Sequence, residues 1–194
     1  MSEEILEKKD RFKLFISKIR NNSKLYFSII SIILIGFITA IFLENKKEKE
    51  NALISKEFNK AKILIKNEKK NESFILLEGI INKKHKFYSP LSLSLIIDFE
   101  LEENHESIIQ LFDKVITIKN IDEENINLIK IKKALFLSNY YGEEEILKTL
   151  NPIINSDSIW RSNAMNIIVS YFENKGDSLK ADQYRKLLNK KDNN

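Results

Sequence analysis

The 194-residue sequence contains no cysteine, only two prolines and only four glycines. The lack of cysteine excludes a lipoprotein anchor on cysteine, a disulfide framework and a thiolate metal site, but it does not identify the redox compartment. The scarcity of proline and glycine leaves few places for sharp turns, and long stretches that alternate apolar and polar residues are also missing. We therefore expect an all-α protein.

Motifs that carry catalysis are missing as well. The chain has no Gly-rich phosphate loop and no GxSxG, HExxH or CxxC motif. His85 and His105 have no second ligand at helical spacing, so we interpret them as solvated residues at helix ends. Neighbouring acids such as those at 143–145 point in different directions on a helix and suit its N-terminal dipole. We expect no enzyme activity, no metal, no cofactor and no small-molecule substrate.

The net charge of +4 is spread unevenly along the chain. Residues 1–43 hold 7 basic and 4 acidic residues, whereas residues 44–194 hold 25 and 24 and are nearly neutral. A nucleic-acid-binding domain would concentrate Lys and Arg on one face, and here charges of both signs are mixed. We expect protein partners and no nucleic acid.

The longest uncharged stretch runs from Leu25 to Leu43 and reads LYFSIISIILIGFITAIFL. As a helix, its nineteen residues would extend roughly 28 Å, close to the hydrocarbon thickness of a bilayer. A cleavable signal peptide has a shorter apolar core and a small-x-small cleavage site, but Ile38 precedes Ala40 by two residues. We predict a basic tail at 1–24, an uncleaved transmembrane signal anchor at 25–43 and a charged joint at 44–50.

The charges flanking this segment leave its orientation open. The fifteen residues before it contain five Lys or Arg, and the fifteen after it contain four. The positive-inside rule favours a cytoplasmic tail only by this small difference.

From residue 51 to the end of the chain, apolar residues recur every three or four positions, which predicts helices. Ser89 is expected to cap the helix that starts at Pro90, Gly176-Asp177 to end one helix and cap the next, and Pro152 to kink or shorten its helix. The predicted helices span residues 50–68, 72–84, 89–103, 105–118, 123–140, 143–155, 159–175 and 178–190.

The second helix of each predicted pair carries the same apolar pattern, with successive steps of 34, 39 and 34 residues. A step of 34 residues is the period of a tetratricopeptide repeat. We therefore predict that residues 51–194 form a solenoid of about four degenerate tetratricopeptide-like helix pairs. The three matching columns are Phe74, Ile108, Leu147 and Ala181; Leu77, Leu111, Leu150 and Tyr184; and Ile81, Val115, Ile154 and Leu188.

The C-terminal segment SIWRSNAMNIIVSYFENKGDSLKADQYRKLL contains Trp160-Arg161, Ala164, Gly176-Asp177 and Ala181. These features resemble the final repeat of the YfgM-like family, tetratricopeptide-like ancillary subunits of the SecYEG translocon. The chain departs from that pattern at Ile159, where a proline is usual, and in its first two repeats, where Leu and Ile replace small residues at helix crossings. The resemblance implies a non-catalytic inner-membrane protein with a cytoplasmic N-terminus and a periplasmic repeat domain. It also implies a chaperone or adaptor whose partners are translocon subunits and exported chains.

Three aromatic residues are the candidates for partner binding. Trp160 would either pack between the third and fourth repeats or anchor a partner in the concave groove. Tyr140 and Tyr171, on inner helices, would line a peptide groove. Two other functions stay open: a membrane-tethered scaffold for an envelope or division complex, and an adaptor that faces the cytoplasm.

Overall fold

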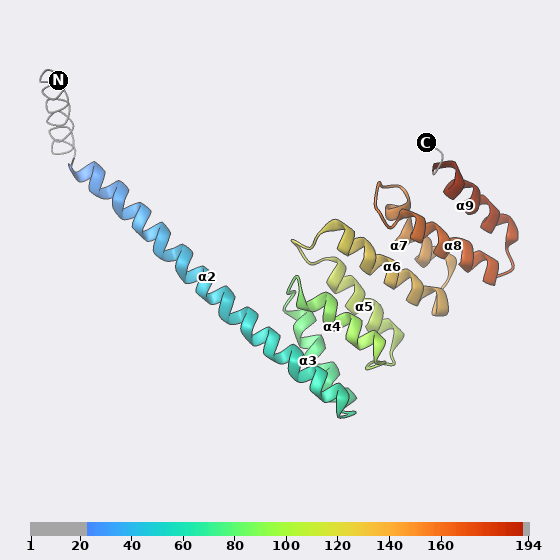
Figure 1. Cartoon of the computed structure of the whole chain (residues 1–194), viewed down its shortest axis with the longest axis horizontal. Helices are drawn as coiled ribbons and strands as arrows, with labels where there is room; N and C mark the ends of the chain where they lie inside the picture. The colour runs from blue at the N-terminus through green and yellow to red at the C-terminus, as the bar shows by residue number, and fades with distance from the viewer. Residues whose placement is uncertain (1–22, 192–194) are drawn as a thin grey trace, which may run out of the picture. The chain divides into compact units, whose positions relative to one another are not determined.

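The computed structural model describes residues 23–191, which form eight helices and no strand (Figure 1). This confirms the all-α prediction. Residues 1–22 and 192–194 lie outside the described set, as do the side chains of residues 23, 25–27, 29 and 189–191. The predicted tail at 1–24 and the Leu25 side chain therefore fall almost wholly outside it. The helices are α2 (Ser23–Lys66), α3 (Lys70–Asn82), α4 (Tyr88–Asp98), α5 (His105–Ile116), α6 (Glu123–Tyr140), α7 (Glu143–Ile154), α8 (Arg161–Asn174) and α9 (Ser178–Lys191).

Helix α2 is continuous over 44 residues. It includes the predicted anchor, the charged joint at 44–50 and most of the first predicted repeat helix. The joint does not interrupt the helix because it consists mainly of Lys and Glu, which are good helix formers, and contains no Gly or Pro. The chain divides into two units, with the boundary between residues 53 and 54.

Within the described part of the chain, no helix combines the length and the apolarity that crossing a membrane requires.

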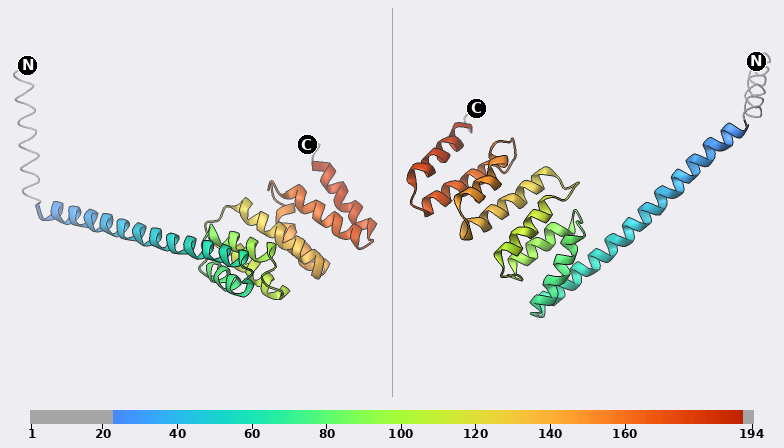
Figure 2. Two further views of the ribbon diagram at one scale, coloured as in Figure 1. Left: turned by 60° about the horizontal axis from the view of Figure 1, so that its bottom comes forward. Right: turned by 180° about the vertical axis from the view of Figure 1, so that it is seen from behind.

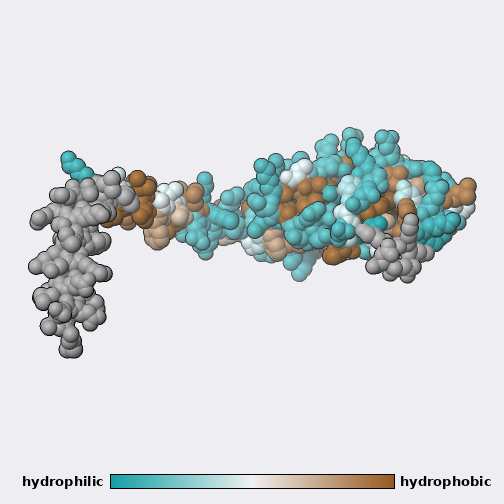
Figure 3. All heavy atoms as spheres, turned by 90° about the horizontal axis from the view of Figure 1, so that it is seen from above, coloured by the Kyte–Doolittle hydropathy of each residue, from teal (hydrophilic) through white to brown (hydrophobic). Residues whose placement is uncertain are grey.

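The first unit exposes apolar side chains on all sides of α2. Every residue from Ile30 to Leu43 is exposed, and ten of these residues are Ile, Leu or Phe. Figure 3 shows brown, hydrophobic atoms along this part of α2, followed by hydrophilic atoms further along the helix. The described side chains of this segment are therefore not buried by any other part of residues 23–191.

In the second unit, consecutive helices lie side by side and form a stack of helix pairs (Figure 2). Helices two apart in the chain also touch, since α3 contacts α5 and α6 contacts α8. One core cluster runs from α2 to α6 and a second from α6 to α9. Helix α6 joins the two clusters, because Ile129 belongs to the first, and Ile131, Ala134 and Leu137 belong to the second.

The repeated columns of the sequence coincide with this core. Leu77, Leu111 and Leu150 are each at most 1% exposed, and burying such a side chain contributes about 1.5 to 3 kcal/mol. The last helix is less enclosed, since Tyr184 and Leu188 pack against the core while partly exposed. Equivalent positions in the first three pairs therefore play equivalent packing roles, and the fourth pair departs from them.

Three helices end in a residue with positive φ followed by a Schellman hydrogen-bond pattern. Gly176 (φ 76°) ends α8 as predicted, but Glu68 (φ 59°) and Glu100 (φ 47°) occupy the same position after α2 and α4. After α4, the Leu101 N–H donates to the Ile96 carbonyl at 2.9 Å. The predicted extension of this helix to 103 was therefore wrong: α4 ends at Asp98, because a glutamate adopts the conformation usually given to glycine.

The start of α4 also differs from the prediction. Ser89 does not cap the helix, since its buried Oγ donates to the Ile80 carbonyl of α3 at 3.1 Å. His85 Nδ1 instead accepts the N–H groups of Phe87 (3.2 Å) and Tyr88 (3.1 Å). His85 is thus part of the turn that starts α4, and not simply a solvated residue.

Small residues do lie at helix crossings in the first two pairs, contrary to the expectation from the sequence. Ala61, Ser73, Ser89 and Ser92 are completely buried. The Ser73 Oγ donates to the Ala61 carbonyl at 3.1 Å and so links α3 to α2. Serine lets two helices approach closely, and its hydroxyl also satisfies one backbone carbonyl.

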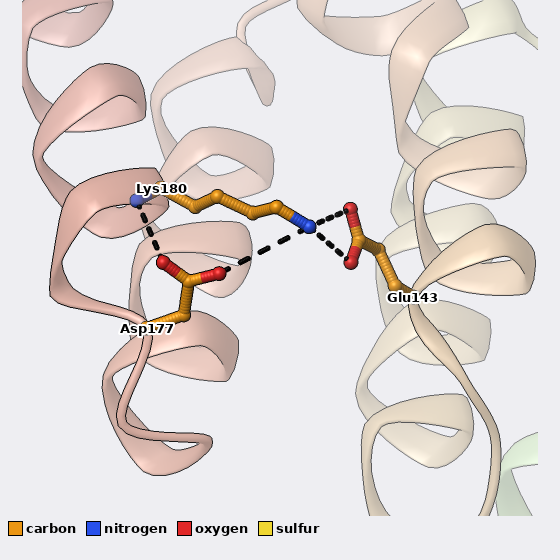
Figure 4. A network of polar contacts seen from close by, with 3 residues as sticks. All are labelled: Glu143, Asp177 and Lys180. Carbon is orange, nitrogen blue, oxygen red and sulfur yellow. Dashed lines mark hydrogen bonds and ion pairs between the residues drawn. The ribbon is translucent and has the colours of Figure 1, made fainter.

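The last two pairs are joined by an ion pair between α9 and α7 (Figure 4). Lys180 Nζ lies 2.8 and 2.6 Å from the two carboxylate oxygens of Glu143 and 4.0 Å from Asp177 Oδ2. Asp177 Oδ1 accepts the Lys180 N–H at 3.1 Å, which confirms the predicted cap of α9. Pro152 lies in the last turn of α7, which ends two residues later at Ile154.

Candidate functional site

The first helices of consecutive pairs, α4, α6 and α8, have two pockets between them. The larger, about 620 Å³, lies between α6 and α8, and we call it the amide groove. The smaller, about 350 Å³, lies between α4 and α6. The amide groove is lined by Ile131, Leu135, Ser138, Asn139, Asn163, Asn166, Ile167, Ser170, Tyr171, Asn174 and Lys175.

Helix α8 presents a polar stripe to the amide groove. Asn163, Asn166, Ser170 and Asn174 follow one another at steps of three, four and four residues, which places them on one face of the helix. All four residues are exposed, while Ala164, Met165, Ile168 and Phe172 on the other side of α8 are buried in the core. Core packing therefore fixes the direction in which the polar stripe faces.

Four carboxamides line the groove, those of Asn139, Asn163, Asn166 and Asn174. None of them forms a hydrogen bond within residues 23–191. Each carboxamide offers one acceptor oxygen and two N–H donors. Their hydrogen-bonding capacity is therefore available to a ligand.

The remaining lining is apolar, with a single charge. Leu135 is 49% exposed and Ile167 is half-buried, whereas the Tyr171 ring is only 8% exposed. Lys175 Nζ lies 5.7 Å from the centroid of the Tyr171 ring and forms no ion pair with the described residues. The amide groove thus combines an amide rim, an aliphatic floor and one cation, with no carboxylate in its lining.

A buried polar network fixes the start of α8 against α6. Asn127 Nδ2 donates to Ser158 Oγ at 3.2 Å, and Ser158 Oγ donates to Glu124 Oε2 at 2.6 Å. Arg161 Nε adds a hydrogen bond to the Ile154 carbonyl at 2.6 Å. Because α6 and α8 form the two walls of the amide groove, this network also sets the groove's geometry.

The pocket between α4 and α6 is more apolar. Phe87 and Leu91 extend into solvent at its edge, with exposed fractions of 60% and 39%. Lys132 Nζ donates to Ser94 Oγ at 2.9 Å and so connects α6 to α4. This pocket lies on the same side of α6 as the amide groove, because Leu128, Lys132, Leu135 and Asn139 follow at helical steps.

The structure does not bring the three predicted aromatic residues together. Tyr171 lines the amide groove but is nearly buried. Tyr140 is 52% exposed and lines a different pocket, of about 410 Å³, together with His105 and Glu100. The ring centroids of Tyr140 and His105 are 3.7 Å apart, so His105 belongs to an aromatic contact and is not simply a solvated helix end.

Trp160 packs against the second core cluster. Its backbone N–H donates to Ser158 Oγ at 3.2 Å, directly before α8. Its indole Nε1 is buried and has no hydrogen-bond partner among the residues that the structure describes. Trp160 therefore packs inside the fold, as one of its two interpretations predicts, and it is not among the residues that line the amide groove.

The asparagines of the amide groove were not among the residues predicted to bind a partner. The spacing of Asn163, Asn166, Ser170 and Asn174 predicts that they share one face of a helix. Asparagine is common on exposed helix faces, so this pattern alone does not indicate a binding site. The contribution of Asn139 depends on α6 lying beside α8, which a reading of single helices does not supply. Among residues 23–191, no group of three or more His, Asp or Glu side chains is arranged to hold a metal ion.

No model of a known protein family, no curated protein and no solved structure matches this chain. The resemblance to the YfgM-like family therefore stays a prediction from the C-terminal motif.

Proposed function

We propose that this chain is a non-enzymatic, membrane-anchored protein whose helix pairs bind polypeptides. The observation that carries the proposal is the amide groove, where four carboxamides without partners in the described chain surround an aliphatic floor. Hydrogen-bonding groups beside exposed apolar side chains suit a protein or peptide ligand. The resemblance to the YfgM-like family adds a more specific role, as a chaperone or adaptor for exported proteins beside the Sec translocon.

The helix pairs are proposed to form a tetratricopeptide-like solenoid. Support comes from the steps of 34, 39 and 34 residues and from the burial of Leu77, Leu111 and Leu150 at equivalent places. Contacts between helices two apart in the chain are consistent with a stack in which each pair packs against the next. Such a stack leaves one layer of helices free to bind ligands along a continuous face.

The segment from Leu25 to Leu43 is proposed to anchor the protein in the inner membrane. No described helix qualifies as a span, so this proposal rests on the uncharged sequence and on the exposure of residues 30–43. A helix that is apolar on every side is unfavourable in water and favourable in a hydrocarbon environment. Ile, Leu and Phe each favour insertion by about 0.3 to 0.6 kcal/mol.

A membrane anchor would restrict the helix pairs to a thin layer at the bilayer surface. This raises their effective concentration for chains leaving a membrane channel, so weak binding is sufficient. The periplasmic location of the pairs is part of the proposal and comes from the family resemblance. A reporter that is active on only one side of the membrane, fused after Asn194, tests it directly.

Co-purification of the full chain with its partners tests the function. The matched control is the same chain ended after residue 50, which keeps the anchor and removes the helix pairs. Enrichment of translocon subunits or exported chains over this control is the expected result. Equal recovery from both proteins contradicts the proposal, and enrichment of one folded envelope complex would favour the scaffold alternative.

A further inference from the structure

We infer that the amide groove binds a polypeptide segment in an extended, non-native conformation, through the segment's backbone and with little dependence on its sequence. This inference rests on the proposed polypeptide binding and specifies the chemistry of the ligand. It depends on the four carboxamides of Asn139, Asn163, Asn166 and Asn174, which stand on the two facing helices α6 and α8.

A carboxamide is the side chain most similar to a peptide group. Both have a planar arrangement with a carbonyl acceptor and N–H donors, so an asparagine can accept from a backbone N–H and donate to a backbone carbonyl. A side chain that only donates, such as lysine, or only accepts, such as aspartate, satisfies half of this pattern. Four asparagines around one groove therefore match a ligand whose exposed groups are peptide bonds.

The dimensions of the groove fit a short extended segment. Asn163 and Asn174 are eleven residues apart on α8, which corresponds to roughly 16 Å along the helix axis. An extended chain advances about 3.3 Å per residue, so roughly five residues would lie beside this stripe. Successive side chains of an extended segment point to opposite sides, which would place alternate ones over Leu135 and Ile167.

The same chemistry argues against a helical ligand. A helix satisfies its backbone N–H and carbonyl groups internally along most of its length and would leave the carboxamides of the groove facing side chains only. A helix also prefers a continuous apolar groove, whereas the lining here is interrupted by four asparagines and two serines. An extended segment, which has free peptide groups, is the occupant that the groove complements.

The charge of the lining restricts the class of ligand that the amide groove can bind. Lys175 is the single charged lining residue, so the groove lacks the cluster of Lys and Arg that nucleic acid requires. It also lacks carboxylates that would select basic segments. We therefore expect neutral or weakly acidic segments to bind, with an acidic residue favoured at the Lys175 end.

Peptide binding to the full chain, purified in a mild detergent, tests the inference. The probe is a fluorescein-labelled peptide of Ser, Thr and Val, about twelve residues long, which forms a helix poorly because it is short and largely β-branched, and which is longer than the groove. A second probe has the same sequence with every backbone nitrogen methylated, which removes all backbone N–H donors and leaves the side chains unchanged. Fluorescence anisotropy measures the affinity of both probes.

The decisive variant is Asn163→Ala/Asn166→Ala, and the matched control is Asn151→Ala, an exposed asparagine of α7 outside the lining. We expect the double variant to bind the first probe about tenfold more weakly, because several modest hydrogen bonds are lost together. Methylation of the peptide should weaken binding to the unmodified protein similarly, and the control should bind normally. Circular dichroism melting verifies that each variant is folded.

Three results would overturn the inference: no binding of the unmethylated peptide, equal binding of the methylated peptide, or normal binding by the folded double variant. If the double variant does not fold, Asn166→Asp decides instead, since it keeps the shape of the side chain but loses the N–H donors. Failure of this inference is distinct from failure of the proposed function. If partners still co-purify with the full chain but the peptide does not bind, the proposed polypeptide binding stands and must use a surface other than the amide groove.

Discussion

Lys180 Nζ of α9 lies 2.6 and 2.8 Å from the carboxylate oxygens of Glu143, which is 37 residues earlier at the start of α7. This hydrogen bond, together with the nearby negative charges of Glu143 and Asp177, raises the pKa of Lys180 above its ordinary value of 10.5. The Lys180 ammonium also lies 5.0 Å from the centroid of the Phe172 ring. One side chain thus connects the last helix to two others.

The pH dependence of stability should reveal this contact. Because the pKa of Lys180 is higher in the folded chain than in the unfolded chain, its stabilisation is fully present below pH 10.5 and is lost as the pH rises through the raised pKa. We expect Lys180→Met to melt at a lower temperature than the unmodified protein at pH 7 to 9. This difference should shrink above pH 10.5. Lys148→Met, an exposed lysine without an ion pair to the described residues, is the control, and an equal effect from it would contradict the assignment.

Removing the hydroxyl of Ser158 should destabilise the fold. Ser158 Oγ is the central group between Asn127 and Glu124, and both Ser158 and Asn127 are buried. We expect Ser158→Ala to lower the free energy of unfolding by about 1 to 3 kcal/mol, because it leaves buried polar groups without a partner. Urea unfolding measures the loss. Ser162→Ala, at an exposed position of α8, should change stability by less than about 0.5 kcal/mol.

Alanine substitutions at equivalent positions of the repeated columns should lower the free energy of unfolding by similar amounts. Leu77→Ala, Leu111→Ala and Leu150→Ala should each destabilise by about 2 to 5 kcal/mol, since all three side chains are buried at corresponding places. Leu179→Ala is the comparison, because Leu179 is 78% exposed. If one column position tolerated alanine as well as Leu179 does, the equivalence of the helix pairs would be wrong.

Substitutions at two helix ends with positive φ should change stability in opposite directions. Gly176 has φ 76°, and none of the described residues has an atom within 4 Å of the position of a β-carbon there, so Gly176→Ala should cost about 1 kcal/mol from backbone conformation alone. Glu100 has φ 47°, and Glu100→Gly should therefore stabilise the protein by roughly 0.5 kcal/mol, after the entropy cost of glycine. Thermal melting of both variants checks the signs, and a loss of stability in Glu100→Gly would contradict the strain at that position.

Much of the fold follows from local signals in the sequence. The predicted bounds of α6 match the structure, because Asp122 caps its start with hydrogen bonds to the N–H groups of Glu124 and Asn125 and the helix ends before Gly142. The end of α4 could not be predicted in the same way. Glu100 adopts a positive φ that favours glycine, and only the packing of Leu101 into the core explains why it does.

The candidate site was less predictable than the fold, because its two walls come from different helix pairs. Tyr140 and Tyr171 were plausible anchors from their position on first helices, yet they line different pockets. The asparagines of α8 were visible as a helical stripe, but their significance depends on Asn139 across the groove. Side-chain exposure, which decides what a ligand can touch, is set by tertiary packing and not by residue type.

The most direct test of the account is site-specific photo-crosslinking from Ser170 of the full chain in living cells. Ser170 lies in the amide groove between Asn166 and Asn174, and a probe there leaves all four carboxamides in place. The matched control carries the probe at Asn151, on exposed α7. The account predicts crosslinks to exported chains and translocon subunits from position 170 that are absent or much weaker from position 151. Equal crosslinking from both positions, or none from position 170, would contradict it.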